Sequence, residues 1–212
     1  MSKVFFDVGI SLDGFIAGPN GGTTNPLGDG GIAIHDWMFR QKSFLEHLGM
    51  EGGEENNTDN DIITDTIKRI GANIMGKNMF VEGEISWPEE APFHTPVFVL
   101  TKEPRNPWKR KGGTTFYFVN EEIEKVLSKA KDAAGQKDVR ISGGADVIRQ
   151  YLNAGLIDEF IIHIAPLFLG TGVRLFEKTD NRKVSFEISK VVGSPLVTHI
   201  SYNVKNKVKN SK

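Results

Sequence analysis

Apolar and polar positions follow two different periods along this chain, and the two periods alternate. Short apolar runs rich in Val, Ile and Phe predict strands buried in a sheet. They lie at residues 3–10, 72–75, 97–100, 115–119, 139–142 and 160–164. Apolar positions three and four residues apart predict amphipathic helices between them. These helical patterns cover residues 35–48, 61–70, 121–134 and 145–153.

Polar residues and glycines mark the ends of these helices. Asp61 and Asn120 stand directly before two helical patterns, where a side-chain oxygen can accept a hydrogen bond from a free backbone N–H. Gly71 and Gly155 follow the last periodic residues of two helices, where glycine commonly ends a helix. Each helix is therefore expected to end shortly before the next strand begins.

Two longer β-like runs close the chain, at residues 184–192 and 197–204, around a Gly-Ser-Pro turn. They predict an antiparallel hairpin, whereas the alternating strands and helices before them predict parallel βαβ units. The expected fold is α/β, with a mixed, mostly parallel sheet, helices on both faces and the hairpin at one edge. Ligands bind such sheets at the carboxyl ends of the parallel strands.

Three segments carry too few apolar groups to pack. The glycine-rich residues 18–31 and the acidic residues 51–61 are expected to be loops on the surface. Residues 206–212 are expected to form a basic, solvated tail after a single domain over residues 1–205.

Composition narrows the class of protein. With 26 Lys and Arg against 27 Asp and Glu, the net charge is −1, so no basic field would attract nucleic acid or an anionic membrane. No apolar stretch approaches the roughly 18 residues of a membrane span, and the first residues do not resemble a signal peptide. A cytoplasmic location is expected.

The absence of cysteine and the spacing of the histidines exclude several kinds of site. The chain has no cysteine, which excludes disulfides, thiolate metal ligands and a cysteine nucleophile. Its five histidines are scattered without the spacing of a zinc site, so no metal is expected. The zinc signature of nucleobase deaminases requires cysteine ligands, so it is absent from this chain.

Three strand-to-helix junctions are suited to phosphate. Val139–Asp146 ends a buried strand in Gly143-Gly144 and starts a helix at once, which offers backbone N–H groups to an anion. Asn73–Phe80 and Val99–Arg105 place lysine or arginine at two further strand ends. Gly143-Gly144 alone is more typical of a plain tight turn, because it is not the full G-x-G-x-x-G pattern. Three such junctions at one edge of a sheet favour an extended dinucleotide.

At these junctions the sequence resembles the dihydrofolate-reductase-like superfamily. The motifs that carry the resemblance are GISLDGFIA at 9–17, IMGK at 74–77, VLT at 99–101, ISGGA at 141–145 and PLFLGTGVRLF at 166–176. The first and last are more similar to the C-terminal reductase domain of the bifunctional riboflavin-biosynthesis deaminase/reductase. The resemblance covers nearly the whole chain and implies a dihydrofolate-reductase-like fold, an NADPH cofactor and a homodimer that pairs through the terminal hairpin.

The resemblance also implies roles for single residues. The cofactor-binding positions are Gly9, Ile16, Gly76, Lys77, Asn78, Leu100, Thr101, Lys102, Arg105, Ser142, Gly143, Gly144, Ala145, Asp146 and Val147. The family commonly has arginine where this chain has Lys77, which loses a bidentate contact to phosphate and leaves the preference for NADPH over NADH open. Substrate is expected at His35, Asp36 and Trp37, with Asp36, Ser11 and Asp13 as the catalytic candidates. Asp36 as a helix first-turn acid, Trp37 as a core residue and Asp13 as a turn residue are the structural alternatives.

The sequence therefore predicts an NADPH-dependent reductase of a small heterocycle, such as a phosphoribosylaminouracil intermediate of riboflavin synthesis. The alternatives are a pterin or dihydrofolate reductase, a nucleotide-binding module without catalysis, and a structural protein on the same scaffold. Neither nucleic acid nor a membrane is expected as a partner.

Overall fold

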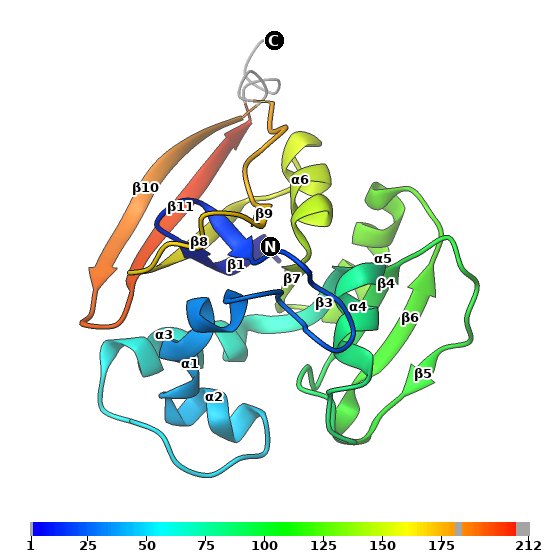
Figure 1. Ribbon diagram of the computed structural model, residues 1–212. Helices are drawn as coiled ribbons and strands as arrows, with labels where there is room; N and C mark the ends of the chain where they lie inside the picture. Colours follow the sequence, from blue (N-terminus) through cyan, green and yellow to red (C-terminus); the bar gives the residue numbers. More distant parts are fainter. Residues whose placement is uncertain (1, 181–183, 207–212) are drawn as a thin grey trace.

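The computed structural model describes residues 2–180 and 184–206 and contains a nine-stranded sheet and a small two-stranded one (Figure 1). The large sheet has the strand order β10-β11-β8-β1-β7-β3-β4-β6-β5. Its strands are β1 Val4–Ser11, β3 Ile70–Gly76, β4 Pro96–Leu100, β5 Trp108–Lys109, β6 Thr115–Val119, β7 Asp138–Gly143, β8 Glu159–Ala165, β10 Val184–Gly193 and β11 Thr198–Asn206. The small sheet pairs β2 Phe15–Ala17 with β9 Val173–Arg174.

The strands from β8 to β6 pair in parallel, and antiparallel strands stand at both edges. β10 and β11 form the predicted C-terminal hairpin, and β11 pairs antiparallel to β8. The predicted fold class, a mixed and mostly parallel sheet with a terminal antiparallel hairpin, is confirmed.

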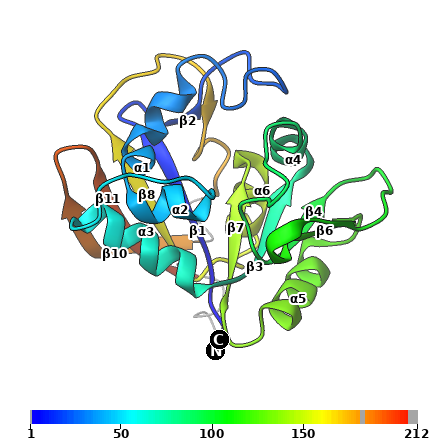
Figure 2. The ribbon, with the colours of Figure 1, turned by 90° about the horizontal axis from the view of Figure 1, so that it is seen from below.

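Helices cover both faces of this sheet. They are η1 Gly31–His35, α1 Asp36–Phe39, α2 Lys42–His47, α3 Thr58–Arg69, α4 Lys77–Glu84, η2 Lys111–Gly113, α5 Ile123–Ala134 and α6 Ala145–Asn153. In Figure 1, α6 lies above the central strands and α1 to α3 lie below them; Figure 2 shows α1 to α3 beside β1 and β8. Nowhere in 2–180 or 184–206 is a helix long and apolar enough to cross a bilayer.

The two faces have separate cores because successive side chains of a strand point to opposite sides. Val4 and Phe6 of β1 pack with α5 and α6 in the largest apolar cluster. Phe5, between them, points to the other face, where the guanidinium of Arg69 in α3 lies 4.1 Å from its ring centre. β1 is therefore buried on both faces, as its Val, Phe and Ile residues predict.

The predicted helix over residues 35–48 is wrong, since the chain forms two short helices there. Gln41 between them is extended and fully buried, and its side-chain amide donates to the Trp37 carbonyl at 3.0 Å. The backbone of Glu54 bonds to that of Arg40 and of Lys42, at 2.7 and 2.9 Å. Pairing with a segment more than ten residues away in the chain therefore outweighs the local helical period.

α3 begins earlier than predicted. Its cap is Asn57, whose side chain accepts from the Asn60 N–H at 2.9 Å, rather than Asp61. The acidic stretch before Asp61 is also not all surface, because Asp59 and Asn60 are buried. Asn60 accepts from the backbone N–H of Ser43 at 2.8 Å, a contact that a local pattern cannot reveal.

Gly71 and Asn120 do not have the predicted roles. Gly71 lies inside β3, and a side chain there would come within 2.7 Å of the Ala134 carbonyl oxygen, so glycine permits the close approach of α5. α5 starts at Ile123 after Glu122, and no side chain caps it. Of the predicted basic tail, residues 207–212 lie outside the described part of the chain, and Asn206 belongs to β11.

The buried face of β3 sets a measurable part of the stability. Ile74 is fully buried in the main cluster, so Ile74→Ala should lower the free energy of unfolding by about 2–5 kcal/mol. Ile85 is 74% exposed, and Ile85→Ala should change it by less than about 0.5 kcal/mol. Urea denaturation of both variants measures the difference, and equal effects would contradict this assignment of the core.

Candidate active site

One large cavity of about 1360 Å³ opens at the carboxyl ends of the parallel strands. Gly9 of β1, Gly76 of β3, Leu100 of β4 and Gly143 of β7 line it, together with His163 of β8. Because five neighbouring strands contribute, the cavity lies where α/β sheets usually bind ligands. Its volume exceeds the roughly 300–1,000 Å³ of a site for one small ligand, so it has room for two.

Most of the predicted site residues come together in this cavity. Those that line it are Gly9, Ile16, His35, Trp37, Gly76, Lys77, Asn78, Leu100, Thr101, Lys102, Ser142, Gly143, Gly144, Ala145, Asp146 and Val147. They come from segments that are up to 138 positions apart in the sequence, between Gly9 and Val147. The three strand-to-helix junctions therefore converge, as expected from the topology.

Asp36 lies outside the cavity. It borders a separate hollow of about 160 Å³, with Ala33, Arg40 and Leu196 among its neighbours. Successive helix positions point about 100° apart, so Trp37 turns into the large cavity while Asp36 turns away from it. The structure does not bring Asp36 to the substrate side, where the sequence places it.

Ser11 and Asp13 also lie outside the cavity and tie the β1–β2 turn together. The Ser11 hydroxyl donates to Asp13 at 2.6 Å and accepts from the Phe15 N–H at 3.0 Å. Asp13 accepts further bonds from the backbone of Leu169 and Gly170, at 3.1 and 2.7 Å. The hydrogen bond from Ser11, joined by these backbone bonds, lowers the pKa of Asp13 to about 2. Asp13 thus has the structural role of the turn alternative, and Ser11 supports the same turn.

Arg105 is the fourth predicted residue outside the cavity. Its guanidinium pairs with Glu84 at 2.5 Å and lies 4.8 Å from the ring centre of Phe118. An arginine held by a carboxylate and an aromatic face is already satisfied. The structure gives it no place beside a cofactor phosphate.

The end of the cavity near α6 has the features of an anion site. Gly144 precedes α6, and no side chain caps that helix. A Cβ added at Gly144 would have no other atom within 4 Å, so the space in front of the helix is open. Asp146 is occupied with Gln150, whose amide donates to it at 2.8 Å. The first N–H groups of α6 therefore face the cavity without a side-chain acceptor, in the orientation that phosphate prefers. The Gly143–Gly144 peptide bond is cis.

Gly76 has a different use from Gly144. A side chain at Gly76 would come within 2.9 Å of the Val147 side chain, so glycine here lets α6 approach β3. Beside it, Lys77 lines the cavity and forms an ion pair with the exposed Glu103. Exposed pairs of this kind contribute little, so an incoming phosphate can compete for Lys77.

Gly9 leaves less room for a ligand ring beside β1 than expected. A side chain at this position would meet Ile34 at 2.8 Å and the His35 ring at 3.0 Å. The space that glycine leaves is therefore filled by η1, although the Gly9 backbone still lines the cavity.

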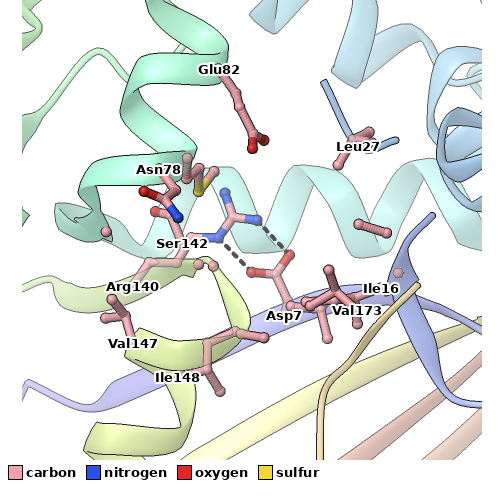
Figure 3. Close-up of a pocket in the computed structure, with 18 of the residues that line it drawn as sticks. Asp7, Ile16, Leu27, Asn78, Glu82, Arg140, Ser142, Val147, Ile148 and Val173 are labelled. Atoms are coloured by element: carbon pink, nitrogen blue, oxygen red, sulfur yellow. Dashed lines mark hydrogen bonds and ion pairs between the residues drawn. The ribbon is translucent and has the colours of Figure 1, made fainter. Parts of the chain in front are cut away.

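Charged groups from β1 and β7 form the cavity floor. Arg140 donates from Nε to Asp7 Oδ1 at 2.5 Å and from its terminal nitrogen to Oδ2 at 3.1 Å (Figure 3). Burial alone would raise the pKa of Asp7, but Arg140 and the nearby His163 outweigh burial and hold the pKa far below its usual value. Figure 3 also shows Glu82 of α4 pointing into the same space, with burial raising the pKa of its carboxyl group.

A row of polar side chains continues from this floor across the sheet. His163 Nε2 lies 3.8 Å from Asp7 Oδ2, and His163 Nδ1 lies 2.6 Å from His199 Nδ1. His199 Nε2 in turn lies 3.0 Å from Asp59 Oδ1. Trp37 packs on both imidazoles, with ring centres 4.9 Å apart in each case. Within the described ranges, no three His, Asp or Glu side chains are placed to hold a metal ion.

The helices α1 to α3 form an apolar wall at the other end. The wall residues that line the cavity include Trp37, Met38, Phe39, Phe44, Leu48, Ile62, Ile63 and Ile67. His35 stands between this wall and the floor, and its Nε2 is shielded from solvent without a partner in the described residues. Burial lowers the pKa of His35 to about 4, so the ring is neutral at pH 7.

The glycine loop at residues 18–31 is folded on itself at the cavity mouth. Gly18 donates to the Leu27 carbonyl at 2.7 Å, and Asp29 donates to the Pro19 carbonyl at 2.8 Å. A side chain at Gly18 would come within 1.9 Å of the Asp29 carbonyl oxygen, which explains the glycine. Gly18 and Leu27 line the cavity, so this loop is one of its walls.

Sequence reasoning missed the floor and the row behind it. Asp7 and Arg140 interrupt runs that otherwise predict buried strands, and a charge in such a strand is a usable signal. His163 gives a similar signal within β8. The pairing of these residues depends on strand order, which a single sequence does not reveal.

Known proteins are similar to this chain in sequence and in fold. The chain is 25% identical over 198 residues to the uncharacterized protein YwjB of Bacillus subtilis, covering 93% of this chain and 96% of that one. A crystal structure from Shewanella sp. PV-4, named for riboflavin biosynthesis, has a TM-score of 0.67 at 24% identity and covers 97% of this chain and 100% of its own. Dihydrofolate reductase from Enterococcus faecalis, complexed with NADP(H), has a TM-score of 0.54 at 14% identity and covers 96% of this chain and 97% of its own.

These structural neighbours confirm the dihydrofolate-reductase-like fold. The family model described as the RibD C-terminal domain matches residues 2–198, which is nearly the whole chain. The resemblance to the riboflavin reductase branch is thereby confirmed, and the chain belongs to the RibD C-terminal domain family.

Proposed function

We propose that this chain is an NADPH-dependent reductase of a small heterocyclic compound. The observation that carries the proposal is the single cavity of about 1360 Å³, which joins a phosphate-type end at α6 to an apolar end at α1–α3. Hydride transfer needs two ligands held in contact, and this cavity has both the volume and the two kinds of surface. The protein need not provide a nucleophile for such a reaction.

The residues present fit a dinucleotide. The pyrophosphate would lie on the N–H groups that follow Gly144, where open space replaces a side chain. Lys77 and Lys102 line the adenosine side and would meet a 2′-phosphate, with Asn78 and Thr101 as neutral donors. When bound, the nicotinamide supplies a hydride to the second ligand. The Enterococcus faecalis neighbour, which holds NADP(H), supports this choice of cofactor.

The apolar wall favours a flat ring without charge. In the described residues, α1 to α3 contribute neither Lys nor Arg to the cavity, so a substrate phosphate would find no free cation at this end. His35 offers one unpartnered nitrogen for a hydrogen bond to a polar edge of the ring, and Trp37 offers an apolar face. A pterin or a pyrimidine without its phosphate suits this surface better than a phosphoribosyl compound does.

NADPH binding and oxidation test the proposal. The fluorescence of NADPH should change saturably on titration with the chain, and absorbance should show its oxidation when an acceptor is added. The acceptors are dihydropterin, dihydrofolate, and a ribosylaminouracil with and without its phosphate. The acceptors without phosphate groups should be reduced faster. Binding without oxidation by any of them would favour the non-catalytic module, and no binding would contradict the proposal.

Lys77 provides a test of the cofactor's 2′-phosphate. Lys77→Ala should raise the dissociation constant of NADPH about tenfold, the equivalent of ~1.4 kcal/mol, and should change that of NADH much less. Lys111→Ala is the matched control, because Lys111 also pairs with a glutamate, Glu89 at 2.9 Å, but lies outside the cavity. Equal losses for NADPH and NADH would remove Lys77 from this role.

We also propose that two copies pair through the terminal hairpin. β10 is an edge strand, and its Phe186, Ile188 and Val191 are 43–58% exposed. An exposed apolar edge of this length favours association with a second strand.

Sedimentation equilibrium should therefore give twice the chain mass of 23.5 kDa. Ile188→Lys places a charge on this edge and should give the single-chain mass with unchanged far-UV circular dichroism. A wild-type mass of one chain would exclude the hairpin dimer.

A further inference from the structure

We propose that Nε2 of His163 is the proton-donating atom of this site, and that Asp59 and His199 behind it determine which atom carries the proton. The donor role rests on the proposed reductase function, which supplies a reaction that needs a proton. The hydrogen-bonded row itself can be tested without that function, because it runs away from the cofactor end of the cavity toward α3.

The row spans four neighbouring strands on one face of the sheet. Arg140, Asp7, His163 and His199 come from β7, β1, β8 and β11, and Asp59 reaches His199 from α3. The register aligns Gly9 with His163 and His163 with His199, which places the two histidines side by side on neighbouring strands. Asp7 and His163 line the cavity, whereas His199 and Asp59 lie behind them.

Hydrogen-bond chemistry fixes most of the protons in this row. The Asp59 carboxylate can only accept, so His199 must donate to it from Nε2. The two Nδ1 atoms are 2.6 Å apart, and that contact requires one proton between them, neither two nor none. The only ring nitrogen whose proton can come and go is therefore His163 Nε2.

The surroundings place that proton next to the cavity. At 3.8 Å from Asp7 Oδ2, His163 Nε2 lies within ion-pair range but beyond hydrogen-bond distance, so its N–H stays available to a ligand. Burial, with His163 and Lys190, lowers the pKa of His199 against the opposing effect of Asp59, so His199 is the neutral ring of the pair. Asp7 and its partner Arg140 are the charged groups beside His163, and His35, which also lines the cavity, is neutral. With the proton bound, two carboxylates balance Arg140 and the imidazolium, and the buried row carries no net charge.

The chemistry of reduction has a use for this proton. When NADPH reduces a C=N or C=O bond, the hydride bonds to carbon and the π electron pair moves to nitrogen or oxygen. That atom takes the proton from His163 Nε2, which leaves NADP⁺, the reduced product and a neutral imidazole. One proton from solvent then restores the row, so each turnover consumes one proton.

Nitrogen NMR of the intact chain tests the proton positions without any ligand. Long-range ¹H–¹⁵N spectra between about pH 5 and pH 8 should show His199 Nε2 protonated throughout. The proton that the pair gains or loses should be the one on His163 Nε2, with one proton shared between the two Nδ1 atoms throughout. Loss of the proton from His199 Nε2 or from the Nδ1 pair instead, or a His163 Nε2 that never carries a proton, would overturn the proposal.

Substitutions on α3 test the influence of Asp59. Asp59→Asn keeps an oxygen that can accept from His199 but removes the charge, so less of the protonated His163 Nε2 should be present at a given pH. Asp65→Asn changes an exposed residue of the same helix and should leave that fraction unchanged. An equal protonated fraction in both variants would contradict the role of Asp59.

Activity separates this inference from the proposed function. With dihydropterin as acceptor, His163→Gln should lower turnover about 10²-fold, abolish its pH dependence and leave the dissociation constant of NADPH unchanged. If that variant keeps the wild-type rate and pH profile, the donor role fails and the reductase assignment stands. If the wild-type chain binds no NADPH, the reductase assignment and the donor role both fail, and the spectra still decide which nitrogen of the pair carries the exchanging proton.

Discussion

Polar groups in the middle of this sheet have to find their partners inside the protein, and the Asp7–Arg140 ion pair is the centre of that arrangement. A carboxylate and a guanidinium on neighbouring buried strands are stable only with good geometry, and the two hydrogen bonds at 2.5 and 3.1 Å provide it. The pair gives a charged floor to a cavity whose far wall is apolar. Asp7 also lies beside His163, which begins the buried row that continues through His199 to Asp59.

The cavity itself follows from strand order. β7 lies between β1 and β3, so the strand that ends in Gly143 delivers α6 beside the ends of both neighbours. Gly76 and Gly144 then have complementary uses: Gly76 lets α6 approach β3, and Gly144 leaves open space in front of the helix. The phosphate-type end and the apolar end are thus built from different chain segments.

The sequence predicted what local patterns determine and missed what distant contacts determine. The strands, the hairpin and α6 follow from periodicity and glycine placement, and the junctions at Gly76 and Gly143 converge as the topology requires. The break at Gln41 depends on pairing with Glu54, and the early start of α3 depends on Asn57. Asp36 was expected in the site but faces the other way, whereas Asp7 and His163 line the cavity because strands distant in sequence are neighbours in the sheet.

The central claim is that one cavity holds a dinucleotide and a ring compound end to end. A crystal structure of the chain with NADP⁺ tests it most directly. The account predicts the pyrophosphate against the first N–H groups of α6, the adenosine beside Lys77 and Lys102, and the nicotinamide near Asp7 and His163, with the space toward Trp37 left free. A nicotinamide bound elsewhere, or an NADP⁺ that fills the apolar end, would contradict it.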